Sequence, residues 1–297
     1  MRLIELQNLQ RVTLERFAQI SIYSVRKNKI SPIDAELLLA YLLGVSRKEI
    51  HSQGLDIPTE KIEAISTEYA ELINQRLLGR PVQYITGRAP FRYLELEVGE
   101  GVLIPRPETE VLVDRAIGFL SMLNTDPKAK SVIDLGAGSG AISIAIASEC
   151  AIKGLEVSVI AVEKSKVAAE WLNKNIAKYE LPIRVVIEDV EHALADVKAD
   201  LVVANPPYIP DDEILPLEVE GFEPQEALRG GPGDGMHVPK KFISAASRLL
   251  KPGGILIIEH HENQTSAIND ELRTDFYSYQ VHADLTGRDR FTSARRR

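Results

Sequence analysis

From Ser131 onward the sequence alternates short apolar runs with amphipathic helical runs. Typical helical runs are "KSKVAAEWLNKNIAKY" and "HVPKKFISAASRLL", and the apolar runs are "SVIDLG", "VSVIAVE", "IRVVIEDV", "DLVVANPPY" and "GGILIIEH". Apolar strands separated by helices are typical of βαβ units, in which helices cover both faces of a parallel sheet. The closing "YSYQVHADLT" and "RFTSARRR" indicate an antiparallel pair at the sheet edge, and we expect arginines 295–297 to form a solvated tail. The pattern therefore predicts an α/β fold with a mostly parallel sheet and an antiparallel edge.

The residues before this region divide into two smaller parts. A helical bundle is predicted over residues 1–78, where "SPIDAELLLAYLLGV" places Ser31 as an N-cap, Pro32 at the first helical position and Gly44 near the end. Residues 79–106 are predicted to form a β-hairpin linker, because "YLELEV" alternates apolar and acidic residues as a half-buried strand does. Glycines 87, 99 and 101 suggest its turns. The large α/β domain is expected over residues 107–297.

Composition and charge argue against several classes of protein. The formal net charge is −8 at pH 7, which argues against a protein that coats nucleic acid through phosphate contacts. The single cysteine, Cys150, allows no internal disulfide and no cysteine metal cluster. Adjacent His260 and His261 in "EHHEN" should point apart on a strand end, so we predict no metal site. We find neither a signal peptide nor a membrane-spanning stretch, and we expect a cytoplasmic protein.

A glycine-rich loop joins the first apolar strand to the helix that follows it. Gly136, Gly138 and Gly140 let the backbone approach a ligand, and the helix N-terminus favours a negative group. A nicotinamide dinucleotide site would prefer Gly-x-Gly-x-x-Gly, and a P-loop would end in Gly-Lys-Ser/Thr. S-adenosyl-L-methionine instead presents a carboxylate to the backbone amides and an ammonium that Asp134 can offset, directly or through water. The loop therefore favours this methyl donor.

Glu163 ends the next predicted strand, about 20 residues after the loop, which is where a carboxylate commonly binds a ribose diol. The alternative is a glycine-rich turn with an unrelated surface glutamate. Taken together, the glycine loop, Asp134 and Glu163 favour a nucleoside cofactor.

The stretch "NPPY" ends the fourth predicted strand, which should adjoin the first. In an open α/β sheet this end of the strands binds ligands. The nitrogen of a planar NH2 group is a poor nucleophile because its lone pair is delocalised. The side-chain oxygen of Asn205 and the backbone carbonyl of Pro206 could each accept one of its N–H bonds, while Pro206 and Pro207 hold that geometry. Tyr208 could stack on the flat acceptor. The motif predicts methylation of an NH2 nitrogen.

With these motifs the chain resembles class I S-adenosylmethionine methyltransferases, and more closely the HemK/PrmC family. The resemblance rests on "GRPVQYITGRAPF", "VLIPRPETE", "DLGAGSGAI", "ANPPYIP", "FEPQEAL", "GGPGDGM" and "GRDRFTSAR", and it spans nearly the whole chain. This family methylates the side-chain nitrogen N5 of glutamine in the Gly-Gly-Gln motif of peptide chain release factors. The resemblance implies the same reaction here, with S-adenosyl-L-homocysteine as the second product. We also expect the release factor to dock on residues 1–78, because the acceptor pair of Asn205 and Pro206 cannot by itself distinguish glutamine from adenine.

The family pattern implies a role for each motif residue. Substrate contacts are expected at Asn205, Pro206, Pro207 and Tyr208, and methyl-donor contacts at Gly136, Ala137, Gly138, Ser139, Gly140, Glu163 and Asn205. Many relatives carry aspartate at the position of Glu163. Some have an aromatic residue at the position of Val190, so the pattern leaves undecided whether the adenine ring stacks on a side chain in this protein. Asp189 is either a partner of the adenine amino group or a solvated strand end. Arg106 and Glu108 in "PRPETE" either order the loop over the cofactor or serve the structure alone.

The residues by themselves are compatible with three other functions. Adenine in nucleic acid also presents a planar NH2, although the acidic charge balance opposes this reading. A related enzyme could methylate a glutamine of a ribosomal protein. A catalytically silent binding module could keep the fold, but its motifs should then have decayed, and here they are intact.

Overall fold

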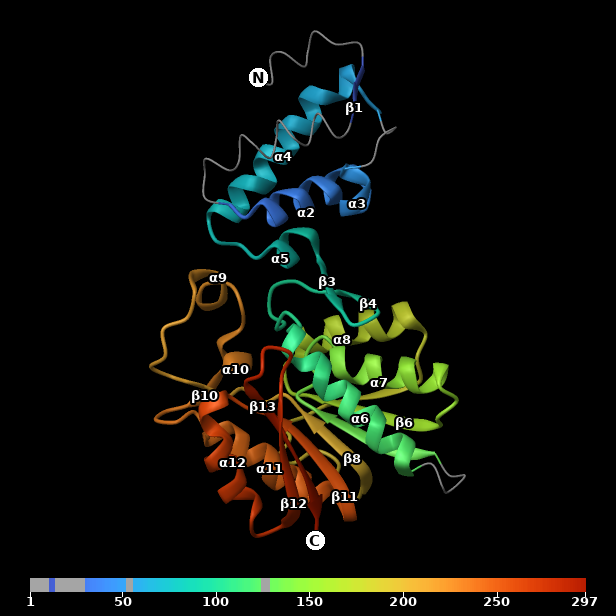
Figure 1. Ribbon diagram of the computed structural model, residues 1–297, viewed down its shortest axis with the longest axis vertical. Helices are drawn as coiled ribbons and strands as arrows, with labels where there is room; N and C mark the ends of the chain where they lie inside the picture. Colours follow the sequence, from blue (N-terminus) through green and yellow to red (C-terminus); the bar gives the residue numbers. More distant parts are fainter. Residues whose placement is uncertain (1–10, 14–29, 52–55, 124–128) are drawn as a thin grey trace. The chain divides into compact units, whose positions relative to one another are not determined.

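The computed structural model describes residues 11–13, 30–51, 56–123 and 129–297 (Figure 1). Within these residues the chain forms two compact units. The smaller unit contains the residues up to Gly87 together with Pro216–Phe222, and the larger contains Arg88–Leu215 and Glu223–Arg297. The sequence places boundaries after residues 78 and 106, whereas the structure separates the units at Gly87. Most of the N-terminal thirty residues lie outside the described part.

The smaller unit is built on two long helices, α2 (Pro32–Leu43) and α4 (Ile62–Leu77). As predicted, the Ser31 hydroxyl caps α2 by accepting from the amide of Ile33, and Gly44 ends it in the left-handed conformation. Among the described residues, the short helices α3 (Arg47–Ile50) and α5 (Val82–Thr86) also belong to this unit. Two three-residue strands that the helical pattern did not predict, β1 (Arg11–Thr13) and β2 (Asp56–Pro58), pair antiparallel. The core of the unit contains Ala35, Leu38, Leu39, Ile50, Ile62, Tyr69 and Ile73.

A segment from far along the chain completes the smaller unit. Helix α9 (Leu217–Glu220) carries Glu218, whose carboxylate accepts from the guanidinium of Arg76 on α4 at 2.6 Å. The same guanidinium donates to Asp34 on α2 at 2.7 Å. Arg76 therefore joins three segments through charge-assisted hydrogen bonds, which are stronger than neutral ones.

The larger unit contains a seven-stranded sheet with the order β12-β13-β11-β8-β5-β6-β7. The five strands β11, β8, β5, β6 and β7 pair in parallel, while β13 and β12 form the antiparallel edge, as predicted. The strands are β5 (Lys130–Leu135), β6 (Val157–Glu163), β7 (Ile183–Ile187), β8 (Ala199–Ala204), β11 (Leu250–Glu259), β12 (Phe276–Ala283) and β13 (Asp289–Arg296). The fourth predicted strand, β8, pairs directly with the first, β5, which confirms the expected adjacency.

Helices cover both faces of this sheet because its central strands are apolar on both sides. On β5, Val132 packs with helices α6 (Glu110–Leu123) and α7 (Ala141–Ile152), and its neighbour Ile133 packs with α11 (His237–Leu249) and α12 (Thr265–Leu272). Figure 1 shows these two helix pairs on opposite sides of the sheet. Helix α8 (Lys166–Tyr179) follows β6 and packs through Leu172 on Ala161. The doubly covered α/β class is therefore confirmed.

A hairpin of β3 (Arg88–Phe91) and β4 (Leu94–Glu97) belongs to the larger unit. β4 alternates buried and exposed residues, as predicted from "YLELEV". The tight turn falls at Arg92, which adopts a positive φ of 53°, and not at a glycine. Its guanidinium reaches the carboxylates of Glu149 and Asp114, and these ion pairs hold a conformation that is uncommon for a residue with a side chain.

The C-terminal arginines do not form the solvated tail that the sequence suggested. Arg295 and Arg296 lie in β13, where Arg295 donates to the carbonyl of Gly253 at 3.2 Å and Arg296 to that of Ser247 at 2.8 Å. That prediction is wrong for these two residues, because their guanidinium groups satisfy backbone carbonyls beside the sheet edge. Among the helices of the described residues, none has the length and apolar composition that would be needed to span a membrane.

Candidate active site

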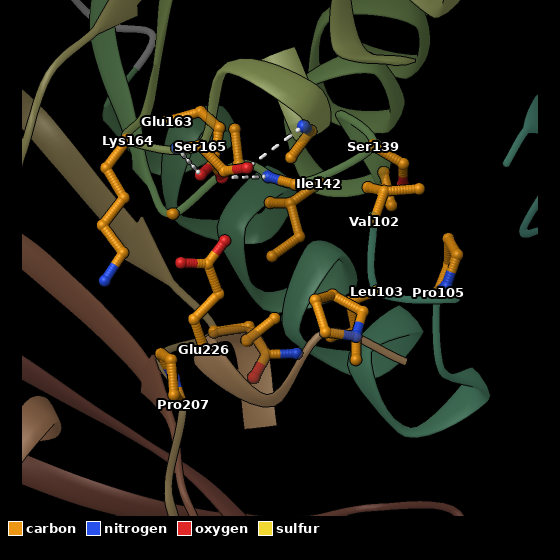
Figure 2. Close-up of a pocket in the computed structure, with 18 of the residues that line it drawn as sticks. Val102, Leu103, Pro105, Ser139, Ile142, Glu163, Lys164, Ser165, Pro207 and Glu226 are labelled. Carbon is orange, nitrogen blue, oxygen red and sulfur yellow. Dashed lines mark hydrogen bonds between the residues drawn. The ribbon is translucent and has the colours of Figure 1, made fainter. Parts of the chain in front are cut away.

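A pocket opens where the parallel strands β5, β6 and β8 end (Figure 2). This is the edge of an α/β sheet where ligands bind. Most of the residues predicted for the site line it: Gly136, Ala137, Gly138, Ser139, Glu163, Asp189, Val190, Asn205 and Pro207. The predicted residues Asp134, Gly140, Pro206 and Tyr208 are not among its lining residues. The structure thus brings the glycine loop and the first residue of "NPPY" to one cavity.

The glycine loop is held against β6 by its backbone. The amides of Gly136 and Ala137 both donate to the carbonyl of Val162, at 2.9 and 3.0 Å. Gly136, Gly138 and Gly140 all have positive φ, which favours glycine at each position. A Cβ on Gly138 would meet no atom within 4 Å, so the backbone here faces open space in the pocket. A ligand could therefore approach the main chain closely at Gly138.

Glu163 is fixed by two backbone amides. Its Oε2 accepts from the amide of Gly138 and its Oε1 from that of Ser165, both at 2.8 Å, and Figure 2 shows these bonds as dashed lines. Burial raises the pKa of the Glu163 carboxyl above its usual value, and the nearby Glu226 carboxylate adds to that rise. Each carboxylate oxygen still has a lone pair available for a hydroxyl group. Glu163 can thus connect the glycine loop to a diol.

Asp134 lies on β5 beneath the loop and is fully buried. Its Oδ2 accepts from both the backbone amide and the hydroxyl of Ser143, while Oδ1 has no hydrogen-bond partner among the described residues. Burial raises the pKa of this carboxyl to about 7. A buried acceptor without a partner is uncommon, and Oδ1 can still accept a hydrogen bond from a water molecule or a cationic group.

Asn205 is connected to two residues that the sequence did not single out for the site. Its Nδ2 donates to Thr109 Oγ1 at 3.1 Å, and the Thr109 hydroxyl donates to Glu259 Oε2 at 2.7 Å. The hydroxyl of Tyr208 donates to the other oxygen, Glu259 Oε1, at 3.1 Å. Asn205 and Tyr208, the first and last residues of "NPPY", are thereby both linked to one buried carboxylate.

The remaining predicted residues occupy the side of the pocket that follows β7. Val190 is largely buried and lines the cavity. The aromatic side chain of Phe242 also lines the cavity and belongs to the same apolar cluster as Val190. The Asp189 carboxylate accepts from the amide of Glu191 at 3.0 Å and also lines the cavity. The pocket thus offers an apolar wall with a carboxylate at one end.

The sequence patterns did not indicate Thr109 and Glu259 as site residues, although both lie in motifs that point to other features. Thr109 belongs to "PRPETE", and Glu259 begins "EHHEN", in which the two histidines are the more prominent candidates for a metal site. His260 is fully buried and bonds through Nε2 to Thr292 Oγ1 at 2.9 Å, so its ring serves the sheet edge. Within the part of the chain that the structure describes, no group of three or more His, Cys, Asp and Glu side chains could hold a metal ion. A carboxylate ending an apolar strand was the signal that could have drawn attention to Glu259.

Comparison with known proteins shows, as a first step, the class of protein to which the chain belongs. A family model described as "Methyltransferase small domain" matches residues 112–216, and one described as "PrmC N-terminal domain" matches residues 25–87. A solved 16S rRNA methyltransferase of T. thermophilus, in complex with AdoMet and guanosine, superposes with a TM-score of 0.50 at 19% identity, covering 71% of this chain and 50% of its own. The fold is that of the S-adenosylmethionine-dependent methyltransferases, and the protein is a methyltransferase.

Curated relatives then give the family. The release factor glutamine methyltransferase of Bifidobacterium longum is 38% identical over 277 residues, which is 88% of this chain and 91% of that protein. The enzyme of the same name from Xylella fastidiosa is 36% identical over 280 residues, or 93% of this chain and 97% of its own. The chain therefore belongs to the release factor glutamine methyltransferase family.

Proposed function

We propose that this protein transfers the methyl group of S-adenosyl-L-methionine to the side-chain nitrogen N5 of the glutamine in the Gly-Gly-Gln motif of class 1 peptide chain release factors. One observation supports this above the others: the Asn205 amide and the glycine loop line a single pocket, in a chain similar over most of its length to enzymes of that name. Methylation of this glutamine would modulate translation termination.

The pocket residues fit the donor group by group. The open backbone at Gly138 leaves room for the amino-acid part, and Asp134, which is buried and does not line the pocket, can offset its ammonium through a water molecule bound at the unpartnered Oδ1. Glu163 is held by two amides so that it can accept from the ribose hydroxyls. Val190 offers an apolar surface to the adenine ring, and Asp189 an acceptor for the adenine amino group. When bound, S-adenosyl-L-methionine supplies an electrophilic methyl group.

The "NPPY" residues orient the acceptor nitrogen. Asn205 Oδ1 accepts one N–H of the glutamine amide and the carbonyl of Pro206 accepts the other, so the nitrogen lone pair is directed toward the donor. Accepting both protons also increases the electron density on the nitrogen. Because Pro206 and Pro207 have fixed φ angles, this geometry exists before the substrate arrives, and the protein does not have to reorganise as charge develops. The hydroxyl of Tyr208 is held by Glu259, which fixes the last side chain of the motif.

The glutamine reaches this site because glycines flank it. A Gly-Gly-Gln loop has no side chains on the two preceding residues, so it can enter a narrow opening. Contacts between the folded release factor and the helices of the smaller unit add affinity. A short peptide with the same motif should therefore be methylated far more weakly than the full-length factor, and no direct binding of nucleic acid or membrane is required.

The test is transfer of labelled methyl from S-adenosyl-L-methionine to purified release factors, ribosomal proteins and nucleic acid in parallel. We expect one added methyl, located by mass spectrometry on the motif glutamine and abolished when that glutamine is replaced by alanine. Preferential labelling of nucleic acid, or of a ribosomal protein, would overturn the proposal in favour of the corresponding acceptor.

A further inference from the structure

The amide of Asn205 must present its oxygen to the substrate if the proposed function holds, yet an asparagine side chain can adopt either of two orientations. The two ends of the amide have opposite roles, since the oxygen only accepts hydrogen bonds and the nitrogen only donates them. If the amide nitrogen pointed into the pocket, the NH2 group of Asn205 would face the NH2 group of the substrate glutamine, and two hydrogen-bond donors would oppose each other. Something in the protein must therefore select one orientation.

The partner of Asn205 supplies that selection. Thr109 Oγ1 lies 3.1 Å from Asn205 Nδ2 and 2.7 Å from Glu259 Oε2. A threonine hydroxyl has one proton. When Glu259 is ionised, its carboxylate can only accept, so that proton is committed to Glu259 and the hydroxyl oxygen can then only accept from Asn205. The NH2 end of the amide is thus directed to Thr109, which leaves Oδ1 for another donor.

The surroundings of these hydrogen bonds favour one orientation of the Asn205 amide over the other. Thr109 is 3% exposed and Glu259 is 0% exposed, so water does not replace either partner. The second oxygen of Glu259 accepts from Tyr208 at 3.1 Å, so the same carboxylate holds both ends of the motif. Burying a carboxylate is costly, and an apolar residue would fill a purely structural position at lower cost. The cost is consistent with a role in the reaction.

We propose that Thr109 and Glu259 are positioning residues that fix the orientation of the Asn205 amide, and thereby decide that the site accepts an NH2 group and not an oxygen acceptor. This inference rests on the proposed function for the identity of the substrate. The orientation of the amide itself is a property of the protein alone. The two can therefore be tested separately.

The matched pair of variants is Thr109→Val and Thr109→Ser. Valine keeps nearly the shape of threonine without its hydroxyl, and serine keeps the hydroxyl without the methyl group. With a full-length release factor, Thr109→Val should lower kcat by about 100-fold, the size expected for a misaligned reacting group. Thr109→Ser should retain most of the rate, and both variants should lower the affinity for S-adenosyl-L-methionine far less than Thr109→Val lowers kcat. Equal losses in the two variants, or no loss in Thr109→Val, would overturn the inference.

A specificity readout separates orientation from simple loss of packing. Wild-type protein should bind a release factor with its motif glutamine more tightly than one with glutamate at that position, because Oδ1 repels a carboxylate. In Thr109→Val the amide is free to turn its NH2 to the pocket, so this preference should shrink. An unchanged preference in Thr109→Val would contradict the inference even if the variant is slow.

The last measurement needs no substrate, so it gives a result even if the acceptor is not a release factor. In protein with isotope-labelled asparagine, NMR should show slow hydrogen exchange of the Asn205 side-chain NH2 in wild type and in Thr109→Ser, and faster exchange in Thr109→Val. Identical exchange in all three would overturn the inference. Failure of wild-type protein to methylate any release factor would instead overturn the proposed function alone.

Discussion

The guanidinium of Arg106 donates to the carboxylate of Glu223 at 2.5 Å, although the two residues are 117 positions apart in the sequence. The other oxygen of Glu223 accepts from the amide of Ile104 at 3.0 Å. Glu223 is buried, and Leu103, Pro105 and Arg106 line the pocket, as Figure 2 shows for the first two. One carboxylate from "FEPQEAL" therefore holds the loop of "VLIPRPETE" that forms a wall of the site.

Removal of the Glu223 carboxylate should loosen this wall. In Glu223→Ala the Ile104 amide loses its acceptor and Arg106 loses its ion pair, so we expect a loss of about 1–3 kcal/mol in the free energy of unfolding and weaker donor binding. Glu223→Gln keeps an oxygen for Ile104 and should lose less of both. Urea denaturation and calorimetric titration with S-adenosyl-L-methionine measure the two effects. Full donor affinity in a folded Glu223→Ala protein would show that the loop does not depend on this pair.

The elements of the fold could be predicted because each is encoded by local patterns. Apolar runs gave the strands of the parallel sheet, and the Ser31 and Gly44 signals placed both ends of α2. The adjacency of β8 and β5 followed from the general behaviour of βαβ chains, and it put the glycine loop and Asn205 at one sheet edge. The strand and cap signals depend on residues within a few positions of one another, whereas the adjacency of β8 and β5 follows from the way βαβ chains connect their strands.

The contacts that orient the site could not be predicted in the same way. Thr109 and Glu259 are 150 positions apart, and their hydrogen bond exists only because η3 (Pro107–Thr109) and the end of β11 pack together. No periodicity in either segment encodes that pairing. The turn at Arg92 was missed for a similar reason, since a residue with positive φ is held there by Glu149 and Asp114 from distant helices.

The glycines of the loop should separate into two classes on substitution. A Cβ on Gly138 would meet open space in the pocket, whereas a Cβ on Gly140 would lie 2.7 Å from a methyl carbon of Leu172 and 2.9 Å from one of Ile144. Both positions have positive φ, so alanine at either costs about 1–2 kcal/mol from the backbone alone. Gly140→Ala should destabilise the protein further, because it adds a clash in the core.

The two variants should differ in which measured quantity falls more: donor affinity in Gly138→Ala and stability in Gly140→Ala. Gly138→Ala should weaken the binding of S-adenosyl-L-methionine in calorimetric titration with only the backbone loss in stability, since its methyl group projects where the ligand should lie. Gly140→Ala should show the larger drop in the urea midpoint. If Gly138→Ala bound the donor as tightly as wild type, the donor would not approach the loop at this glycine.

The Glu259 carboxyl should make stability depend on pH. Burial raises its pKa from the usual 4.5 to about 7 in the folded protein, and the charge of Glu108 adds to that rise. The hydrogen bonds from Thr109 and Tyr208 and the charge of Arg290 act in the opposite direction and lower the pKa. Between these two values the folded state binds more protons than the unfolded state. The contribution of Glu259 to stability is therefore greatest at low pH and falls as pH rises from about 4.5 to about 7.

The variant Glu259→Gln isolates this effect, since glutamine does not titrate. The free energy of unfolding of wild type minus that of Glu259→Gln should decrease as pH rises through that window and then level off. Asp134 has a pKa raised to about 7 as well, but it is present in both proteins and cancels in the difference. Urea denaturation followed by fluorescence of Trp171, the single tryptophan, reports on the larger unit. A pH-independent difference would mean that Glu259 does not titrate in this range.

Asn205→Ala should separate donor binding from methyl transfer. The variant removes the acceptor Oδ1 that directs the substrate nitrogen, so kcat should fall by about 100- to 1000-fold, the loss typical when one preorganised polar group is removed from a reacting centre. Donor affinity should fall much less, because Glu163 and the glycine loop remain. Single-turnover methyl transfer and calorimetric titration measure the two quantities on the same protein.

The control is Asn205→Asp, which keeps an acceptor oxygen in the pocket without the NH2 that Thr109 receives. Aspartate presents an oxygen at both ends of its carboxylate, so it needs no orienting partner. Its carboxylate lies opposite the oxygen of Thr109, however, and must accept a hydrogen bond from that hydroxyl or from a water molecule. We expect a rate between those of wild type and Asn205→Ala. A turnover by Asn205→Ala close to that of wild type would remove this side chain from the reaction, and with it the proposed reading of the motif.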